Sequence, residues 1–141
     1  MIVGIIGSGG REHAICQSMN NSSKIKKIFC FPGNAGTKKI AENIDLDLEN
    51  FEAIKKFIFD NKIELIIIGP EKPLVSGLVD YLEKFEIKVF GPNKLASQLE
   101  GSKIFTKKLC QKFKIPTAKF GIFENKESAK EFLIKTNYPI V

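Results

Sequence analysis

The sequence predicts an α/β fold with an open, doubly wound parallel sheet, followed by a linker and the first elements of a second domain. Two observations lead to this fold class. Short apolar runs alternate along the chain with segments of helical periodicity, which is the order of parallel strands joined by crossover helices. Residues 65–68 are apolar at successive positions, and such a strand is covered on both faces of its sheet.

The elements of the first domain follow from these patterns in chain order. The apolar runs predict strands at residues 2–6, 25–31, 63–68 and 88–90. The glycine-rich residues 7–13 are expected to follow the first strand and open the first helix. Two further helices are predicted from apolar side chains that recur at a 3.6-residue period. The apolar face of the first comprises Phe51, Ile54, Phe57 and Ile58, and that of the second comprises Leu74, Val75, Leu78, Val79 and Leu82.

The pattern changes after Gly91 and Pro92, and we expect a domain boundary near residue 100. The first domain then comprises residues 1–100, and residues 101–141 begin a second one. Residues 93–114 predict two consecutive helices, residues 118–123 a strand, residues 126–136 a helix and residues 138–141 the start of another strand. Because the chain stops where a strand begins, we expect it to be a fragment of a longer protein.

Composition excludes several classes of protein. Apolar residues make up 43% of the 141 residues, as in ordinary globular domains, and no apolar run approaches the length of a membrane span. The net charge is +6, but the lysines are scattered, whereas nucleic-acid binding shows a basic patch. The chain opens as a strand and not as a signal peptide. Three widely spaced cysteines, at positions 16, 30 and 110, indicate free thiols in the cytoplasm and neither disulfides nor a zinc site.

The glycine-rich loop after the first strand predicts a phosphate site. Glycines let the backbone turn tightly and approach a ligand, and the start of the following helix offers free N–H groups to an anion. A guanidinium adds a charged fork that suits phosphate. The predicted ligand-binding residues of this loop are Gly7, Ser8, Gly9, Gly10, Arg11 and Glu12.

Two other interpretations of the same loop stay open. A dinucleotide site requires a third glycine, where this chain has Glu12, and an acidic residue after the second strand, where the chain continues from Phe31 to a proline. Both departures disfavour a dinucleotide. The loop could also be a tight turn without any ligand. The single histidine, His13, is interpreted as a packing or hydrogen-bonding residue more readily than as a catalytic one.

The ends of the other strands add further candidate residues. In an open α/β sheet, ligands bind outside the carboxyl ends of the strands, where four glycine-bearing loops are expected to converge. Glu71 could accept hydrogen bonds from sugar hydroxyls or an amine, or be an exposed acid at a helix start. Asn34 could bind the ligand or stabilise a turn. The candidates on these loops are Asn34, Gly36, Gly69, Pro70 and Glu71.

Together these motifs resemble the amino-terminal part of the phosphoribosylamine–glycine ligases, a family of the ATP-grasp superfamily. The resemblance spans essentially the whole chain in the family's order and spacing. It rests on the stretches GSGGREHA at residues 7–14, PGNAG at 32–36, GPEKPL at 69–74, GP at 91–92, LEGSK at 99–103 with Phe105 and Lys107, and IPTA at 115–118.

The resemblance implies a ligase that joins 5-phosphoribosylamine and glycine in purine biosynthesis, with ATP converted to ADP and phosphate. It implies a Rossmann-like substrate-binding domain in which Gly9, Gly10 and Arg11 suit the phosphate and Glu71 the ribosylamine. Lys103 would reach the ATP phosphates, although with Lys107 it could instead form a solvated helix face. The Mg²⁺ or Mn²⁺ ligands and the main ATP-binding residues are expected beyond Val141, so this fragment should be inactive alone and carry no catalytic residue.

The resemblance also implies small-molecule partners, a monomer, and no binding to nucleic acid or membrane. Two alternatives remain from the sequence. One is a Rossmann-type nucleotide-binding module without ligase activity, and the other is a related ATP-grasp ligase of the purine pathway that acts on a different ribonucleotide.

Overall fold

A computed structural model describes residues 1–136 of the chain and divides the chain into two compact units, Met1–Gly101 and Ser102–Val141. The strand expected at residues 138–141 lies outside the described residues. In the part that the structure describes, no helix is both long enough and apolar enough to cross a membrane.

The first unit contains a five-stranded parallel sheet, which confirms the predicted fold class. The strands run in the order β3-β2-β1-β4-β5, and each neighbouring pair is parallel. The two-residue strand β3 was not expected from the sequence. The strands are β1 (Ile2–Gly7), β2 (Lys27–Pro32), β3 (Glu42–Asn43), β4 (Leu65–Ile68) and β5 (Val89–Phe90).

Helices follow most strands of this unit, as the periodicity predicted. The apolar stripe at residues 74–82 forms two helices and not one, because Gly77 adopts a left-handed conformation with φ 98°, which ends the first helix. The helical elements are α1 (Gly10–Asn20), the 3₁₀ turn η1 (Thr37–Lys39), α2 (Phe51–Asp60), α3 (Glu71–Ser76), α4 (Leu78–Glu83) and α5 (Lys94–Gly101).

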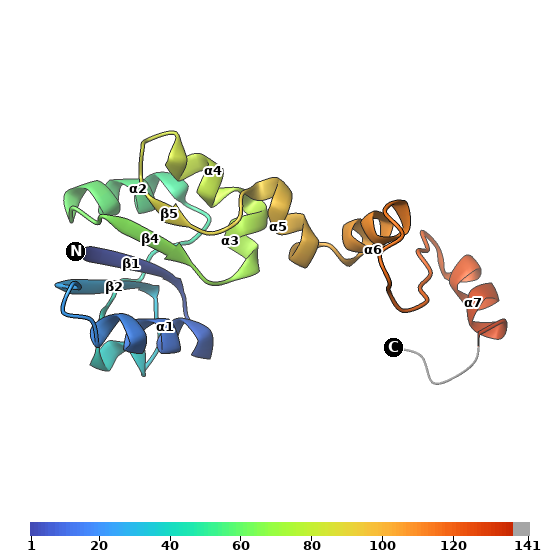
Figure 1. Ribbon diagram of the computed structural model, residues 1–141, viewed down its shortest axis with the longest axis horizontal. Coiled ribbons are helices and arrows are strands. Elements are labelled where there is room, and N and C mark those ends of the chain that lie inside the picture. Colours follow the sequence, from blue (N-terminus) through green and yellow to red (C-terminus); the bar gives the residue numbers. More distant parts are fainter. Residues whose placement is uncertain (137–141) are drawn as a thin grey trace. The chain divides into compact units, whose positions relative to one another are not determined.

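Both faces of the sheet are covered, α1 lying on one face and α2 and α4 on the other (Figure 1). Successive strand residues enter opposite cores, as the two-residue repeat of a strand requires. In β2, for example, Cys30 packs with the α1 side, whereas Phe31 packs with the side of α2 and α4. The sheet is therefore an internal layer, and its strand ends are the places where a ligand can approach.

The second unit contains α6 (Lys103–Lys112) and α7 (Lys126–Ile134), in agreement with the helices expected there. The strand expected at residues 118–123 is wrong, because that segment has no regular secondary structure. A strand needs a neighbour to satisfy its N–H and C=O groups, and residues 102–136 contain no other strand that could pair with it.

Candidate functional site

The strand order creates a crevice at the carboxyl edge of the sheet. The connections from β1 and β4 lead to opposite faces, so the point between these two central strands is the switch point at which open α/β sheets bind ligands. Short backbone bonds hold the loops together there. The N–H of Gly69 donates to the Ile6 carbonyl and the N–H of Gly33 to the Gly7 carbonyl, both at 3.1 Å.

A cleft of about 480 Å³ lies at this edge. Its walls come from the loop after β1, the loop before α2 and the first turns of α3. Its lining residues are Gly7, Ser8, Gly9, Arg11, Glu12, Asp47, Leu48, Glu49, Pro70, Lys72, Pro73 and Ser76. The volume falls within the usual range of small-molecule pockets.

Helix α1 begins at this cleft, with Gly9 as its N-cap residue. The first N–H groups of a helix have no partner within the helix. One of them is satisfied internally, because the Gly9 N–H donates to Glu12 Oε2 at 2.6 Å. A β-carbon built on Gly10 meets no atom within 4 Å, so the helix start is open at that position.

Arg11 lies between two carboxylates. Its Nε donates to Glu12 Oε1 at 3.2 Å and its Nη2 to Glu71 Oε1 at 3.3 Å. The hydrogen bonds that the guanidinium donates to Glu71 and then to Glu12 raise the pKa of Arg11, which stays charged. The pKa of Glu71 is lowered, first by a backbone N–H at its own position and then by the Arg11 side chain. The guanidinium thus joins the loops that follow β1 and β4.

Asn34 cross-links the loop after β2 to the glycine-rich loop. Its Nδ2 donates to the Ser8 carbonyl at 2.8 Å and to the Gly9 carbonyl at 3.2 Å. Its Oδ1 accepts from the backbone N–H groups of Gly36 and Thr37. These hydrogen bonds stabilise a turn at Asn34, which is one of the two roles that the sequence left open. They also place the residue next to the cleft, because Ser8 and Gly9 line it.

The other glycines of these loops lie against side chains of the protein. A β-carbon on Gly69 would lie 1.9 Å from Glu12 Oε1, and one on Gly36 would lie 2.8 Å from the His13 ring. One on Gly91 would lie 3.0 Å from Leu74. The His13 ring therefore packs against the loop after β2, which agrees with the packing role expected from the sequence.

Sequence reasoning missed one wall of the cleft. Asp47, Leu48 and Glu49 line it, and the Glu49 carboxylate forms an ion pair with Lys72. The sequence did not predict this wall, because the preceding strand β3 has two residues and is too short to produce a periodic pattern. These carboxylates make the lining richer in acidic groups than the motifs alone suggested, and such groups suit an amine or sugar hydroxyls.

Lys103 belongs to the second unit, where it is the first residue of α6 and is exposed. The helix is capped by Ser102, whose Oγ accepts from the Phe105 N–H at 3.2 Å. Lys107 differs from Lys103, because its Nζ donates to Thr117 Oγ1 at 2.6 Å. The second lysine thus holds the segment that follows α6, and the first is free to face solvent or a ligand.

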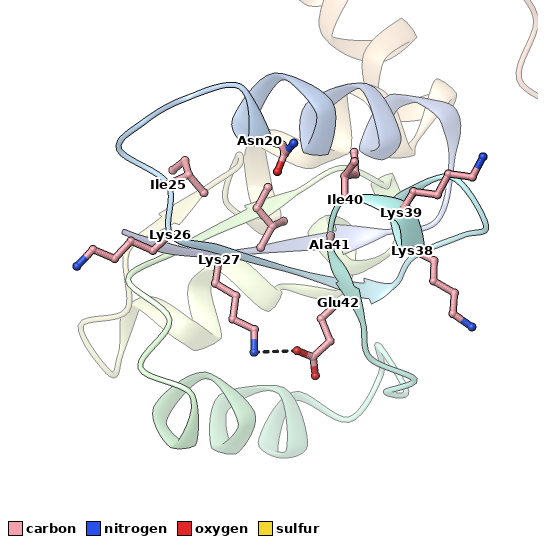
Figure 2. A pocket seen from close by; sticks show the side chains of 10 residues that line it. Asn20, Ile25, Lys26, Lys27, Lys38, Lys39, Ile40, Ala41 and Glu42 are labelled. Atoms are coloured by element: carbon pink, nitrogen blue, oxygen red, sulfur yellow. Dashed lines mark ion pairs between the residues drawn. The ribbon is translucent and has the colours of Figure 1, made fainter.

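A second hollow, of about 420 Å³, lies beside the β2–β3 edge (Figure 2). Lys27 pairs there with Glu42 at 2.8 Å. The amino groups of Lys26, Lys38 and Lys39 extend outward from the hollow (Figure 2). A phosphate site needs donors that converge on one point, so these lysines form a solvated surface and the cleft at the glycine-rich loop remains the candidate site.

Comparison with known proteins identifies the family. A family model described as "Phosphoribosylglycinamide synthetase, N domain" matches residues 1–100. The phosphoribosylamine–glycine ligase of Caldanaerobacter subterraneus is 45% identical over all 141 residues, which cover 34% of that protein. That of Clostridium acetobutylicum is 44% identical over 137 residues, 97% of this chain and 33% of its own length. The chain thus spans about a third of these relatives.

Solved structures agree with this assignment. The crystal structure of the phosphoribosylamine–glycine ligase from Thermotoga maritima has a TM-score of 0.69 at 31% identity, covering 97% of this chain and 31% of that one. The N5-carboxyaminoimidazole ribonucleotide synthetase of Thermus thermophilus has a TM-score of 0.68 at 19% identity, over 97% of this chain and 37% of its own, and shares the fold. Because the family model matches most of the sequence, the chain belongs to the phosphoribosylglycinamide synthetase family.

Proposed function

We propose that this chain is the substrate-binding part of a ligase that joins 5-phosphoribosylamine and glycine in purine biosynthesis. The proposal rests mainly on the cleft at the β1–β4 switch point. Helix α1 begins at this cleft, and the Arg11 side chain in its first turn lines it. Family membership supports the reaction, since relatives that match the whole chain are named phosphoribosylamine–glycine ligases.

In this proposal the phosphate of 5-phosphoribosylamine lies at the start of α1. The N–H groups of Gly10 and Arg11 and the guanidinium of Arg11 would receive it, since an anion at a helix start gains from both donors and dipole. The Glu71 carboxylate, now paired with Arg11, would accept hydrogen bonds from the ribosylamine. Ser8, Gly36, Gly69 and Pro70 would shape the loops that hold the sugar.

The reaction proposed for the whole enzyme has two steps. The glycine carboxylate attacks the γ-phosphorus of ATP, which forms an acyl phosphate and releases ADP. The amine nitrogen of phosphoribosylamine then attacks the carbonyl carbon, the C–O bond to phosphate breaks, and the nitrogen loses a proton. The cleft residues would hold the amine for the second step, in which positioning supplies a large part of the rate.

ATP and Mg²⁺ or Mn²⁺ are part of the same proposal. Residues 102–136 would begin the ATP-binding domain, and the Lys103 amine would contact the ATP phosphates as a point charge. Residues 1–136 contain no group of three or more histidine, cysteine or carboxylate side chains that could hold a metal ion. In the proposal, which follows the resemblance to the ligase family, the metal ligands belong to sequence beyond Val141. The free thiols of Cys16, Cys30 and Cys110 suit a cytoplasmic enzyme.

Replacing Arg11 tests the proposal. In the full-length enzyme, Arg11→Ala should raise the KM for phosphoribosylamine about 10- to 100-fold, because a charge-assisted hydrogen bond to phosphate contributes about 1.5–3 kcal/mol. The KM for ATP should change little, which steady-state kinetics with each substrate varied in turn will show.

The matched control is Lys38→Ala, which removes one positive charge from the hollow beside β3 and should leave both KM values unchanged. A rise in the KM for ATP alone would contradict the role assigned to Arg11. Binding of NADH by the chain, followed by fluorescence, would favour the alternative of a Rossmann-type nucleotide-binding module.

A further inference from the structure

Glu12 is the most deeply buried charged residue of the cleft and the one whose role is least expected. The residue is 3% exposed, and a buried carboxylate is costly unless donors and cations surround it. Here the donors are the N–H of Gly9 at 2.6 Å and Nε of Arg11 at 3.2 Å. Both belong to the loop that would bind the phosphate.

The glycines around this carboxylate are spaced to receive it. A β-carbon on Gly7 would lie 2.6 Å from Glu12 Cγ, one on Gly9 would lie 2.9 Å from Oε2, and one on Gly69 would lie 1.9 Å from Oε1. Real β-carbons essentially never approach other heavy atoms so closely. Gly7 is the last residue of β1, Gly9 lies in the loop that follows it and Gly69 directly follows β4, so one side chain fills the space between the two central strand ends.

We propose that Glu12 is a positioning residue, which rests on the function proposed above. Its carboxylate fixes the loop after β1 against the loop after β4 and aims the Arg11 guanidinium at the phosphate. It does not itself contact the substrate. In a dinucleotide site the third glycine allows the helix to pack closely on the strand, whereas here a carboxylate stands at that position and links the two central loops.

A double-mutant cycle on the stability of the full chain tests whether the Glu12 side chain packs between the loops after β1 and β4. Gly69→Ala should lower the melting temperature by about 5–10 °C, because the new methyl group displaces a held carboxylate. In the Glu12→Ala background the same substitution should cost almost nothing, since the space is free. Gly10→Ala is the control and should leave the melting temperature nearly unchanged, because nothing lies within 4 Å of its β-carbon.

A second cycle tests the positioning part, with ribose 5-phosphate as the probe and calorimetry as the measurement. Glu12→Gln keeps the shape and an acceptor for the Gly9 N–H, so the melting temperature should hold, yet the affinity should fall about fivefold because Arg11 keeps only Glu71 of its two ionic partners. In the Arg11→Ala background, Glu12→Gln should have no further effect. The exposed Glu83→Gln is the control for removal of a carboxylate and should change neither quantity.

The outcomes separate this inference from the proposed function. An equal cost of Gly69→Ala with and without Glu12 would overturn the packing role. An unchanged affinity in Glu12→Gln, or the same loss with and without Arg11, would overturn the positioning role. Failure of the unmodified chain to bind ribose 5-phosphate would count against the proposed function and the positioning role together, whereas the stability cycle would still decide the packing role.

Discussion

The central loops of the sheet edge, after β1 and β4, differ from the flanking loops after β2 and β5. The central loops line the cleft and carry the charged side chains Arg11, Glu12 and Glu71. Gly33 and Gly91 of the flanking loops lie against uncharged side chains, Thr37 and Asn43 in one loop and Leu74 in the other, whereas Gly7, Gly9 and Gly69 lie against the Glu12 side chain. A glycine at these strand ends therefore marks a close approach to the backbone, and the charge of the approaching side chain distinguishes the central loops from the flanking ones.

Among substitutions that test the packing role of the flanking loops, the largest loss of stability is expected at Gly33, in the loop after β2. Its φ of 74° is unfavourable for other residues, and a β-carbon would lie 2.4 Å from Asn43 Oδ1. Asn43 accepts there from Thr37 Oγ1 and donates to the Asn34 carbonyl, both at 2.8 Å. Gly33→Ala should lower the free energy of unfolding by about 3 kcal/mol, because it strains the backbone and disrupts these hydrogen bonds. Urea unfolding measures it, and a loss below about 1 kcal/mol would contradict the packing role.

A smaller effect is expected at Gly91, after β5. Gly91→Ala should cost about 1–2 kcal/mol, because the new methyl group lies 3.0 Å from Leu74 and 3.3 Å from Val79 and a packed core yields little. The affinity for ribose 5-phosphate should not change. A variant that kept its stability and lost affinity would show that this flanking loop binds the ligand after all.

The smallest expected effect is a loss of stability at alkaline pH, which originates beneath the central loops. Burial raises the pKa of the Cys16 thiol from 9.0 to about 12, and burial also raises that of Cys30, which donates to the Gly7 carbonyl at 3.5 Å. Because the folded-state pKa is raised, the stabilisation is complete below pH 9 and is lost as pH rises toward 12. The Cys16 contribution to this loss should be about 1 kcal/mol at pH 10.

Urea unfolding at pH 8, 9 and 10 measures this loss, and Cys16→Ala should make the decline shallower. The control is Cys110→Ala, because Cys110 lies in the second unit and is only partly buried. Its substitution should leave the decline as it is. An equal decline in the Cys16 variant would assign the pH dependence to other groups.

The sequence predicted the parts of the fold that have long periodic patterns. These parts are the strands β1, β2 and β4 and the helix α2. Because the strands are parallel, the sequence also predicted that the loops after them converge at one edge of the sheet. It missed β3, because two polar residues produce no alternation, and with β3 it missed the acidic wall at residues 47–49. It predicted a strand at residues 118–123 from local apolar character, although a strand also requires a partner.

The sequence predicted the residues of the candidate site but not the contacts between them. The loop residues could be named, because glycines next to an arginine at a helix start indicate an anion site. The bonds that organise the site could not, since they join residues far apart in the chain, such as Arg11 to Glu71 and Asn34 to Ser8. Such contacts depend on the strand order, which places β4 beside β1.

Binding of a sugar phosphate in the cleft can be followed residue by residue in an NMR titration of the ¹⁵N-labelled chain with ribose 5-phosphate. If the cleft binds the sugar phosphate, the largest amide shifts should occur at Ser8, Gly10 and Arg11, and Arg11→Ala should weaken the binding that these shifts report about 10- to 100-fold. Shifts at Lys26, Lys38 and Lys39 instead, around the hollow beside β3, would contradict the account and move the site to the other edge of the sheet.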